Sequence, residues 1–100
     1  MIKTKTETFL GFAVKSRKII FGTENIVAFK KRKYLILLDA ALSENTTHKL
    51  TEYANAQSIP LLVVKIPLAE TLHRNGVKAI ALIDPNMAAA IIKDLEKSEK

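Results

Sequence analysis

Residue types that commonly perform catalysis are few in this chain and lie far apart in the sequence. There is no cysteine, so a thiolate nucleophile, a thiolate metal site and a disulfide are all excluded. Neither His48 nor His73 has a second histidine or a carboxylate at the short spacing of a metal motif, so we interpret both as surface or helix-end residues. The serines fall in no nucleophile motif, and the three glycines are too dispersed to form a phosphate-cradling loop.

Asp39 is the carboxylate in the most suggestive position, because it ends a predicted strand and open α/β sheets bind ligands at strand ends. A lone aspartate there more often forms a turn, and we favour that role. A small hydrolase or transferase that uses Asp39 or His73 is therefore the least supported function class. The sequence predicts a protein that is not an enzyme and that holds neither a metal nor a cofactor.

The segment FGTENIVAFKKRKY, residues 21–34, has the residue types for a different chemistry. Gly22 lets a ligand approach the backbone closely, and Thr23, Glu24 and Asn25 supply donors and acceptors for the edges of bases. The backbone N–H groups that begin a helix add a partial positive charge. A purely structural interpretation is open at this point, in which Thr23 caps the helix and Glu24 complements its dipole.

Positive charge is concentrated in the same third of the chain. Residues 1–33 hold nine Lys and Arg against two Glu, a net of +7, whereas residues 34–100 hold seven against eight acidic residues, a net of −1. Such clustering favours a surface that binds a polyanion, nucleic acid before an anionic membrane. The alternative is that the basic composition serves solubility alone. The candidate phosphate-binding cations are Arg17, Lys18, Lys30, Lys31, Arg32 and Lys33.

Length and composition predict one domain over residues 1–100. Of these 100 residues 48% are hydrophobic and 26% charged, which is enough to bury one core. The longest apolar runs, such as 34–38 and 59–64, are far too short to cross a bilayer, and no secretory signal is recognisable. The absence of cysteine fits a reducing compartment, so we expect a cytoplasmic protein with no membrane partner.

Helices and strands alternate along the chain. Thr4 and Glu7 have the spacing of a capping box, Ser43 and Asp84 are expected to cap two later helices, and Pro85 suits a first helical position. Such alternation predicts a central sheet with helices on both sides. The expected helices cover about 4–16, 23–31, 44–58, 68–74 and 85–100, with residues 93–100 frayed, and the expected strands cover 19–20, 34–40, 61–66 and 79–83.

A family resemblance agrees with this order of elements. FLGFAVKSRKIIFG at 9–22, followed by LILL, LSENTTHKL, IPLLVV and AIALID at matching spacing, resembles the bacterial YlxQ-like proteins. These belong to the kink-turn RNA-binding superfamily of ribosomal proteins, the archaeal L-seven-Ae and eukaryotic L-thirty-e group. The resemblance spans nearly the whole chain. It implies an α/β fold, a three-layer α/β/α sandwich around a mixed four-stranded sheet.

The resemblance also implies an RNA-binding position. Members that recognise kink-turns use Gly-x-Asn-Glu at the start of the second helix, a lysine one turn further and often an arginine at its end. Gly22 matches the glycine and Arg32 the late arginine. Glu24 and Asn25 occupy the Asn-Glu positions in reversed order, and Ala28 stands where the lysine would be.

A second contact in the superfamily is the loop before the last strand, which supports an extruded base. Its counterpart here is 74–78, where Val77 would supply an apolar platform and Arg74 and Lys78 are the other candidate contacts. The glycines that the family carries in the preceding helix are Ala69 and His73 in this chain.

The expected function is non-catalytic binding of a kinked or structured RNA, ribosomal or other, in translation or ribosome-related processes. Residues 23–25 would face base edges, and the basic residues would hold flanking phosphates. The alternative is a protein-interaction module of the translation or ribosome-assembly apparatus that has lost direct RNA readout, with ribosomal or translation proteins as its partners. The reversed Glu24 and Asn25 and the alanine at position 28 favour this alternative.

Overall fold

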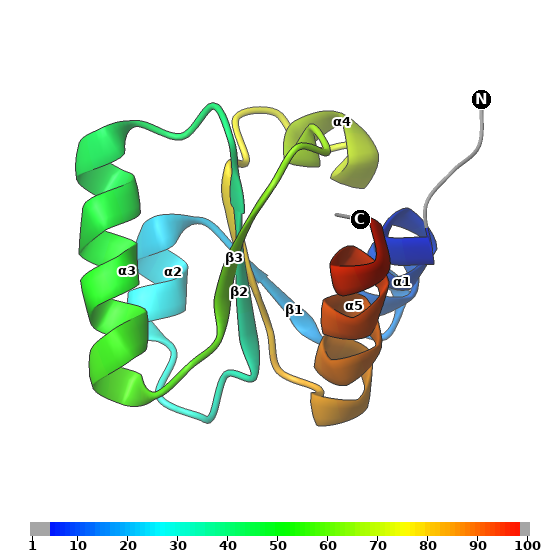
Figure 1. The fold of residues 1–100 in the computed structure, drawn as a ribbon, viewed down its shortest axis with the longest axis horizontal. Coiled ribbons are helices and arrows are strands. Elements are labelled where there is room, and N and C mark those ends of the chain that lie inside the picture. The colour runs from blue at the N-terminus through cyan, green and yellow to red at the C-terminus, as the bar shows by residue number, and fades with distance from the viewer. Residues whose placement is uncertain (1–4, 99–100) are drawn as a thin grey trace.

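A computed structural model describes residues 5–98, which form helices on both sides of one sheet (Figure 1). Every predicted element is present and in the predicted order, although Thr4 of the expected capping box lies outside the described residues. The helices are α1 (Lys5–Lys15), α2 (Thr23–Ala28), α3 (Glu44–Gln57), α4 (Leu68–Leu72) and α5 (Pro85–Ser98). The strands are β1 (Ile19–Phe21), β2 (Leu35–Asp39), β3 (Leu61–Val64) and β4 (Ala79–Leu82).

The sheet is mixed and lies between two layers of helices. Its strand order is β1-β4-β2-β3, in which β2 and β3 run parallel and β4 is antiparallel to both β1 and β2. Helices α2 and α3 cover one face, and α1, α4 and α5 cover the other (Figure 1). The predicted three-layer α/β/α sandwich around a mixed four-stranded sheet is confirmed.

Strand β2 supplies both cores, because alternate side chains of a strand point to opposite faces. Leu35 and Leu37 join the core on the side of α1, α4 and α5, whereas Ile36 and Leu38 join the core beneath α2 and α3. All four side chains are fully buried. A continuous apolar run such as 34–38 is typical of a strand covered on both faces, and β2 is such a strand.

The continuous apolar run at 61–64 is typical of a fully buried strand, but strand β3 is only partly buried. It lies at an edge of the sheet with β2 as its neighbour, and it ends at Val64, two residues before the predicted end. Val63 is 51% exposed, because the helices leave its side chain half uncovered. A short apolar run has the same pattern in an edge strand as in a central strand, so the sequence alone does not show which of the two β3 is.

Helix α2 ends at Ala28, three residues before its predicted end. Phe29 is extended, with φ −70° and ψ 120°, and its N–H donates to the carbonyl of Asn25 as the chain turns toward β2. The run of cations at 30–33 therefore lies in the loop between α2 and β2. Lysine and arginine favour helices, so the predicted helix continued into these cations and ended too late.

The predicted caps of α3 and α5 are confirmed. The Ser43 hydroxyl accepts a hydrogen bond from the N–H of Thr46 (3.3 Å). The Asp84 carboxylate accepts from the N–H groups of Asn86 (2.8 Å) and Met87 (3.2 Å). Both side chains satisfy N–H groups that lack a partner within the helix.

Helix α5 extends to Ser98, and the fraying expected from Lys93 onward stays a prediction. The helix is tied to α1 through Asp94, whose carboxylate accepts from the N–H (2.9 Å) and the hydroxyl (2.6 Å) of Thr6. Thr6 is fully buried, which protects these bonds from water. This contact joins α1 to α5 between residues 88 positions apart in the sequence.

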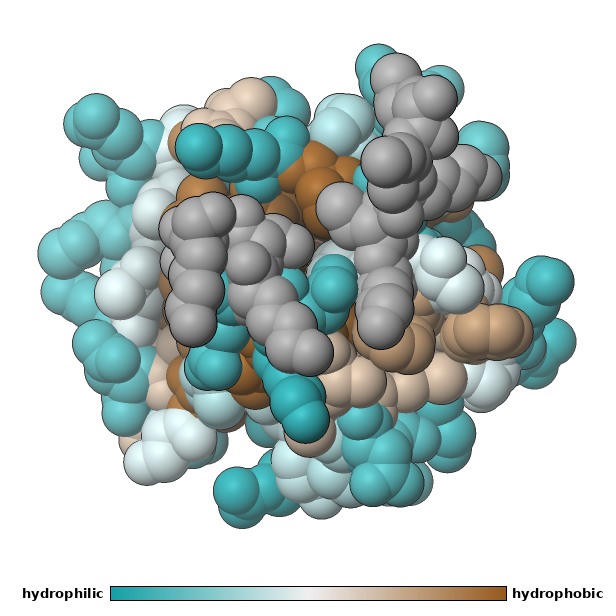
Figure 2. Space-filling model, turned by 45° about the vertical axis from the view of Figure 1, so that its right-hand side comes forward, coloured by the Kyte–Doolittle hydropathy of each residue, from teal (hydrophilic) through white to brown (hydrophobic). Residues whose placement is uncertain are grey.

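The side of the molecule that comes forward in Figure 2 carries hydrophilic residues around its outline, with apolar side chains visible between them in several places. The large apolar residues that are most exposed within the described part are Phe12, Val27 and Val63. No helix within residues 5–98 is long and apolar enough to span a bilayer.

Candidate nucleic-acid interface

A tight turn joins β1 to α2 and carries the predicted base-facing residues. Gly22 has φ 90° and ψ 146°, a conformation that is essentially restricted to glycine, and its N–H donates to the Ala79 carbonyl of β4 (2.9 Å). The Asn25 amide donates to the Phe21 carbonyl (2.9 Å) and closes the turn from the helix side. The backbone of the turn therefore requires Gly22 whether or not a ligand binds.

The interpretation that Thr23 caps α2 is wrong. Gly22 occupies the N-cap position without a side chain to bond, and Thr23 is already helical and half-buried. Glu24 and Asn25 are exposed. The Asn25 amino group uses one of its two N–H donors in the turn, so its second N–H and its carbonyl oxygen remain for a ligand. The Glu24 carboxylate is a second acceptor. The turn thus presents acceptors suited to the amino and imino groups of bases.

The loop between α4 and β4, residues 73–78, lies beside this turn. The register of β1 against β4 pairs Phe21 with Ile80, so the turn and the loop leave the sheet at the same end. The guanidinium carbon of Arg74 lies 4.3 Å from the centroid of the Phe21 ring, a cation–π contact that links the two segments. The structure therefore brings the two predicted contact segments together, and we call them the turn end.

Two loop residues have structural roles as well. Val77 is half-buried and packs against the core under α1, α4 and α5, so only part of its side chain can serve as the predicted apolar platform. The Lys78 side chain is exposed, while its carbonyl accepts from the Asp39 N–H (2.8 Å). His73 and Gly76 turn the loop with positive φ angles of 56° and 77°.

The predicted phosphate-holding cations lie at the opposite end of the sheet, which we call the basic end. The loop between α1 and β1 is fixed there by the Lys18 carbonyl, which accepts from the Ile83 N–H (3.0 Å). The loop between α2 and β2 enters beside it, because the Tyr34 N–H donates to the Leu82 carbonyl (2.8 Å). The exposed cations of the basic end are Arg17, Lys18, Lys30, Lys31 and Arg32.

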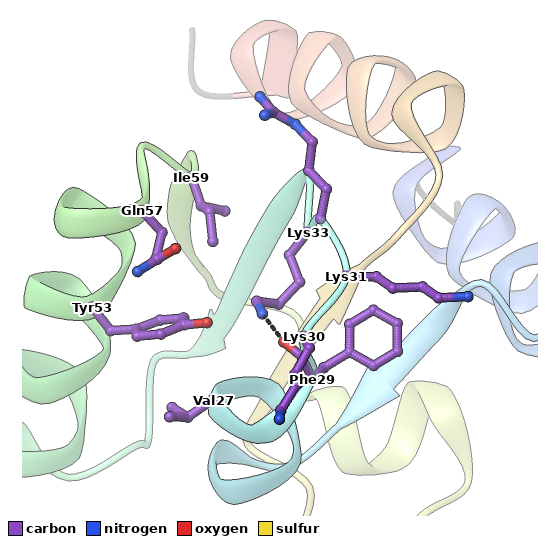
Figure 3. A pocket seen from close by; sticks show the side chains of 9 residues that line it. Val27, Phe29, Lys30, Lys31, Lys33, Tyr53, Gln57 and Ile59 are labelled. Carbon is purple, nitrogen blue, oxygen red and sulfur yellow. Dashed lines mark hydrogen bonds between the residues drawn. The ribbon is translucent and has the colours of Figure 1, made fainter.

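Lys33 does not present its charge to the surface as predicted. It is 6% exposed, and its ammonium donates to the Phe29 carbonyl (2.6 Å) and lies 5.3 Å from the centroid of the Tyr53 ring (Figure 3). A cation at the C-terminus of a helix satisfies carbonyls that lack a partner within the helix and opposes the negative end of the dipole. We therefore remove Lys33 from the candidate phosphate contacts and assign it to the end of α2.

The predicted turn-forming role of Asp39 is confirmed. Its carboxylate accepts from the N–H groups of Ala41 (2.8 Å) and Leu68 (3.1 Å). These bonds hold the chain after β2 and the first residue of α4. These two hydrogen bonds to backbone N–H groups are enough to explain an aspartate at the end of this strand.

One histidine lies on a helix and the other just after one, and His48 has a partner that the spacing argument missed. His48 Nε2 lies 2.9 Å from Glu52 Oε1, one turn further along α3, so this histidine does have a carboxylate at short spacing. Both side chains are largely exposed. His73 is exposed at the end of α4. Within residues 5–98, no group of three or more His, Cys, Asp or Glu side chains is placed to hold a metal ion.

Sequence reasoning missed two parts of this surface. One is Phe21, which stacks with Arg74 and depends on the pairing of β1 with β4, a contact that a single sequence does not show. The other is a groove between the 29–33 loop and α3, lined in part by Tyr53 and Gln57. These two residues match the helical period of the buried stripe, so the pattern placed them against the core.

The fold and the site together define a small α/β/α protein with hydrogen-bonding groups at one end of its sheet and cations at the other. No protein-family model matches the chain, and no curated protein matches its sequence. Among solved structures, the chain is similar to a protein of unknown function from Bacillus halodurans C, with a TM-score of 0.88 and 20% identity over 94% of this chain and 99% of that one. At this identity the similarity shows the fold alone.

Proposed function

We propose that the protein binds a structured RNA without catalysing a reaction. The proposal is supported mainly by the positions of the turn end and the basic end, which lie on either side of α2. This helix has six residues and is about 9 Å long at 1.5 Å per residue, so one RNA can reach both ends. One RNA that bends away from a regular duplex can offer unpaired base edges to the turn end and phosphates to the basic end.

The two ends would contribute differently to binding. Glu24 and Asn25 accept hydrogen bonds from bases, and such contacts supply preference among sequences. Arg74 adds a guanidinium plane on which an unstacked base can rest. The basic end contributes affinity that depends on salt, because bound lysines and arginines release counterions from the phosphates.

The resemblance to the kink-turn superfamily supports a kinked RNA, ribosomal or other, in translation or ribosome-related processes. The reversed Glu24 and Asn25 and the alanine at position 28 change the donors and acceptors offered to the bases, so the preferred bases should differ from those of a standard kink-turn. This proposal implies a cytoplasmic location, where translation takes place.

Binding to three RNAs at two salt concentrations tests the proposal. We expect a kinked RNA with an internal loop to bind more tightly than a plain duplex or an unstructured strand of equal length, and all three to weaken as salt rises. Equal affinity for all three would contradict site-specific recognition. No binding at low salt would contradict RNA binding altogether.

A pair of matched variants assigns the preference to the turn end. Glu24→Gln removes a charged acceptor in the first turn of α2, and Glu44→Gln makes the same change in the first turn of α3. Glu24→Gln should reduce the preference for the kinked RNA by at most the roughly 1–3 kcal/mol of one base contact, because the glutamine oxygen still accepts but carries no charge. Glu44→Gln should leave the preference unchanged.

A further inference from the structure

A groove of about 500 Å³ lies at the basic end, between the 29–33 loop and the C-terminal half of α3 (Figure 3). Its volume falls within the roughly 300–1,000 Å³ that is typical of small-ligand sites. Figure 3 shows Tyr53 and Gln57 projecting from the α3 side and Val27 and Lys30 from the side of α2. The groove is lined by Val27, Phe29, Lys30, Lys31, Arg32, Lys33, Tyr53, Gln57 and Ile59.

The charge of this groove is entirely positive. Four of its nine lining residues are lysine or arginine, and none of the described residues that line it is acidic. Lys30, Lys31 and Arg32 are exposed, and the Lys33 ammonium lies between Phe29 and Tyr53. Within residues 5–98 that ammonium donates one hydrogen bond, so its charge is not neutralised by a carboxylate. The groove therefore favours an anionic occupant.

The walls of the groove also offer apolar and neutral polar surface. Val27 is 49% exposed, whereas its neighbour Ile26 is fully buried, so Val27 lies on the face of α2 that is turned away from the core. The Tyr53 ring is half-buried, and its hydroxyl and the Gln57 amide can donate or accept hydrogen bonds. A phosphate ion alone would contact the cations but would leave Val27, Tyr53 and Gln57 without a ligand contact.

We propose that this groove binds one unpaired nucleotide of the RNA, with the phosphate at Lys30 and Lys31 and the base between Val27 and the α3 wall. A base has an apolar face and a hydrogen-bonding edge, which matches an apolar wall that stands near an amide and a hydroxyl. An acidic peptide would match the charge but would leave the valine and the tyrosine ring without a flat partner. The inference rests on the proposed RNA-binding function and adds a nucleotide position that lies apart from the turn end.

Titration with small ligands tests the groove separately from the RNA. We expect adenosine or uridine 5′-monophosphate to shift the backbone amide resonances of Val27, Tyr53 and Gln57 in ¹⁵N NMR spectra. Inorganic phosphate should shift resonances of the 30–32 segment while leaving Tyr53 and Gln57 in place. Equal shifts with phosphate and with the nucleotides would overturn the assignment of a base position. Equal shifts with hexaglutamate would overturn it in favour of an acidic peptide.

Matched variants then test the groove with the kinked RNA. Gln57→Glu adds a negative charge to the α3 wall, and Asn55→Asp makes the same change at an exposed position outside the groove. Gln57→Glu should weaken binding by up to roughly 5-fold, the effect of a like charge about 4 Å from a phosphate in water, and by less at the larger separation across the groove. Val27→Ala should also weaken binding, whereas Val63→Ala, at a valine of similar exposure, should have no effect.

The outcomes separate this inference from the proposed function. If Gln57→Glu and Asn55→Asp bind the kinked RNA equally and no nucleotide shifts the groove resonances, the groove assignment is overturned and RNA binding stands. If the wild-type protein binds none of the RNAs at low salt, the proposed function fails and the inference fails with it.

Discussion

Lys31 and Lys33 belong to one run of four cations but have different surroundings. Lys31 is exposed in the loop between α2 and β2, whereas Lys33 is 6% exposed with its ammonium bonded to the Phe29 carbonyl. Removal of a buried lysine leaves the group that accepted its hydrogen bond without a partner, which costs stability. Removal of an exposed lysine has little effect on stability. The two residues should therefore differ in what their removal changes.

The prediction at the residue scale compares Lys33→Met with Lys31→Met, because methionine keeps much of the apolar stem. Lys33→Met should lower the free energy of unfolding by about 1–3 kcal/mol, the cost of a lost hydrogen bond to a charged donor. Lys31→Met should leave stability within about 0.5 kcal/mol and reduce the salt dependence of RNA binding by about one counterion. Urea denaturation and binding across a salt series measure both quantities.

The roles assigned to the two lysines would be contradicted if Lys33→Met were as stable as the wild type, or if Lys31→Met bound RNA with an unchanged salt slope.

The burial of Lys33 could not be predicted from sequence, because one of its two aromatic neighbours, Tyr53, comes from a helix twenty positions further along the chain. In contrast, the caps at Ser43 and Asp84 were predicted correctly, because capping depends on residues within one helical turn.

At the scale of single elements, Gly22 and Gly11 have opposite effects on stability. Gly22 is held at φ 90° in the turn before α2, and a Cβ there would meet the Asn25 amide nitrogen at an ordinary 3.9 Å, so the cost of a side chain lies in the backbone angle. Gly11 lies inside α1, and a Cβ there would meet no atom within 4 Å. Gly11 therefore does not serve close packing against a neighbour, and its flexibility weakens the helix.

We predict opposite changes in stability for alanine at these two positions. Gly22→Ala should lower the free energy of unfolding by about 1–3 kcal/mol through backbone strain. Gly11→Ala should raise it by roughly 0.5–1 kcal/mol, because alanine favours the helix. Thermal or urea unfolding of the two variants beside the wild type measures the difference. A stable Gly22→Ala protein would show that the turn can adopt another conformation.

Element boundaries were predicted where local chemistry decides them and missed where tertiary contacts do. The end of α2 is set by the chain's return to the sheet, although lysine and arginine alone would continue the helix. The edge position of β3 follows from strand order, which its own residues do not encode. Helix α5 is joined through Asp94 to Thr6 of α1, a contact between distant parts of the sequence that local patterns do not show.

At the scale of the whole molecule, the candidate contacts divide between two ends of the sheet. The sequence predicted their residue types, and strand pairing determines their grouping: Arg74 joins the turn at Gly22, while the cations of 30–32 join those of 17–18. Binding at both ends would let one RNA be selected by its bases and held by its phosphates. The groove beside the basic end would add a position for an unpaired nucleotide.

Ultraviolet crosslinking in cells, followed by identification of the crosslinked peptides and sequencing of the attached RNA, tests the central claim most directly. If the turn end and the basic end contact RNA, a structured RNA should be recovered, with crosslinks in peptides that contain residues 21–33 and 74–78. Crosslinks confined to α1 and α5 would contradict the assigned surface. Recovery of no RNA, together with protein partners that persist after nuclease treatment, would contradict RNA binding and favour a protein-interaction module.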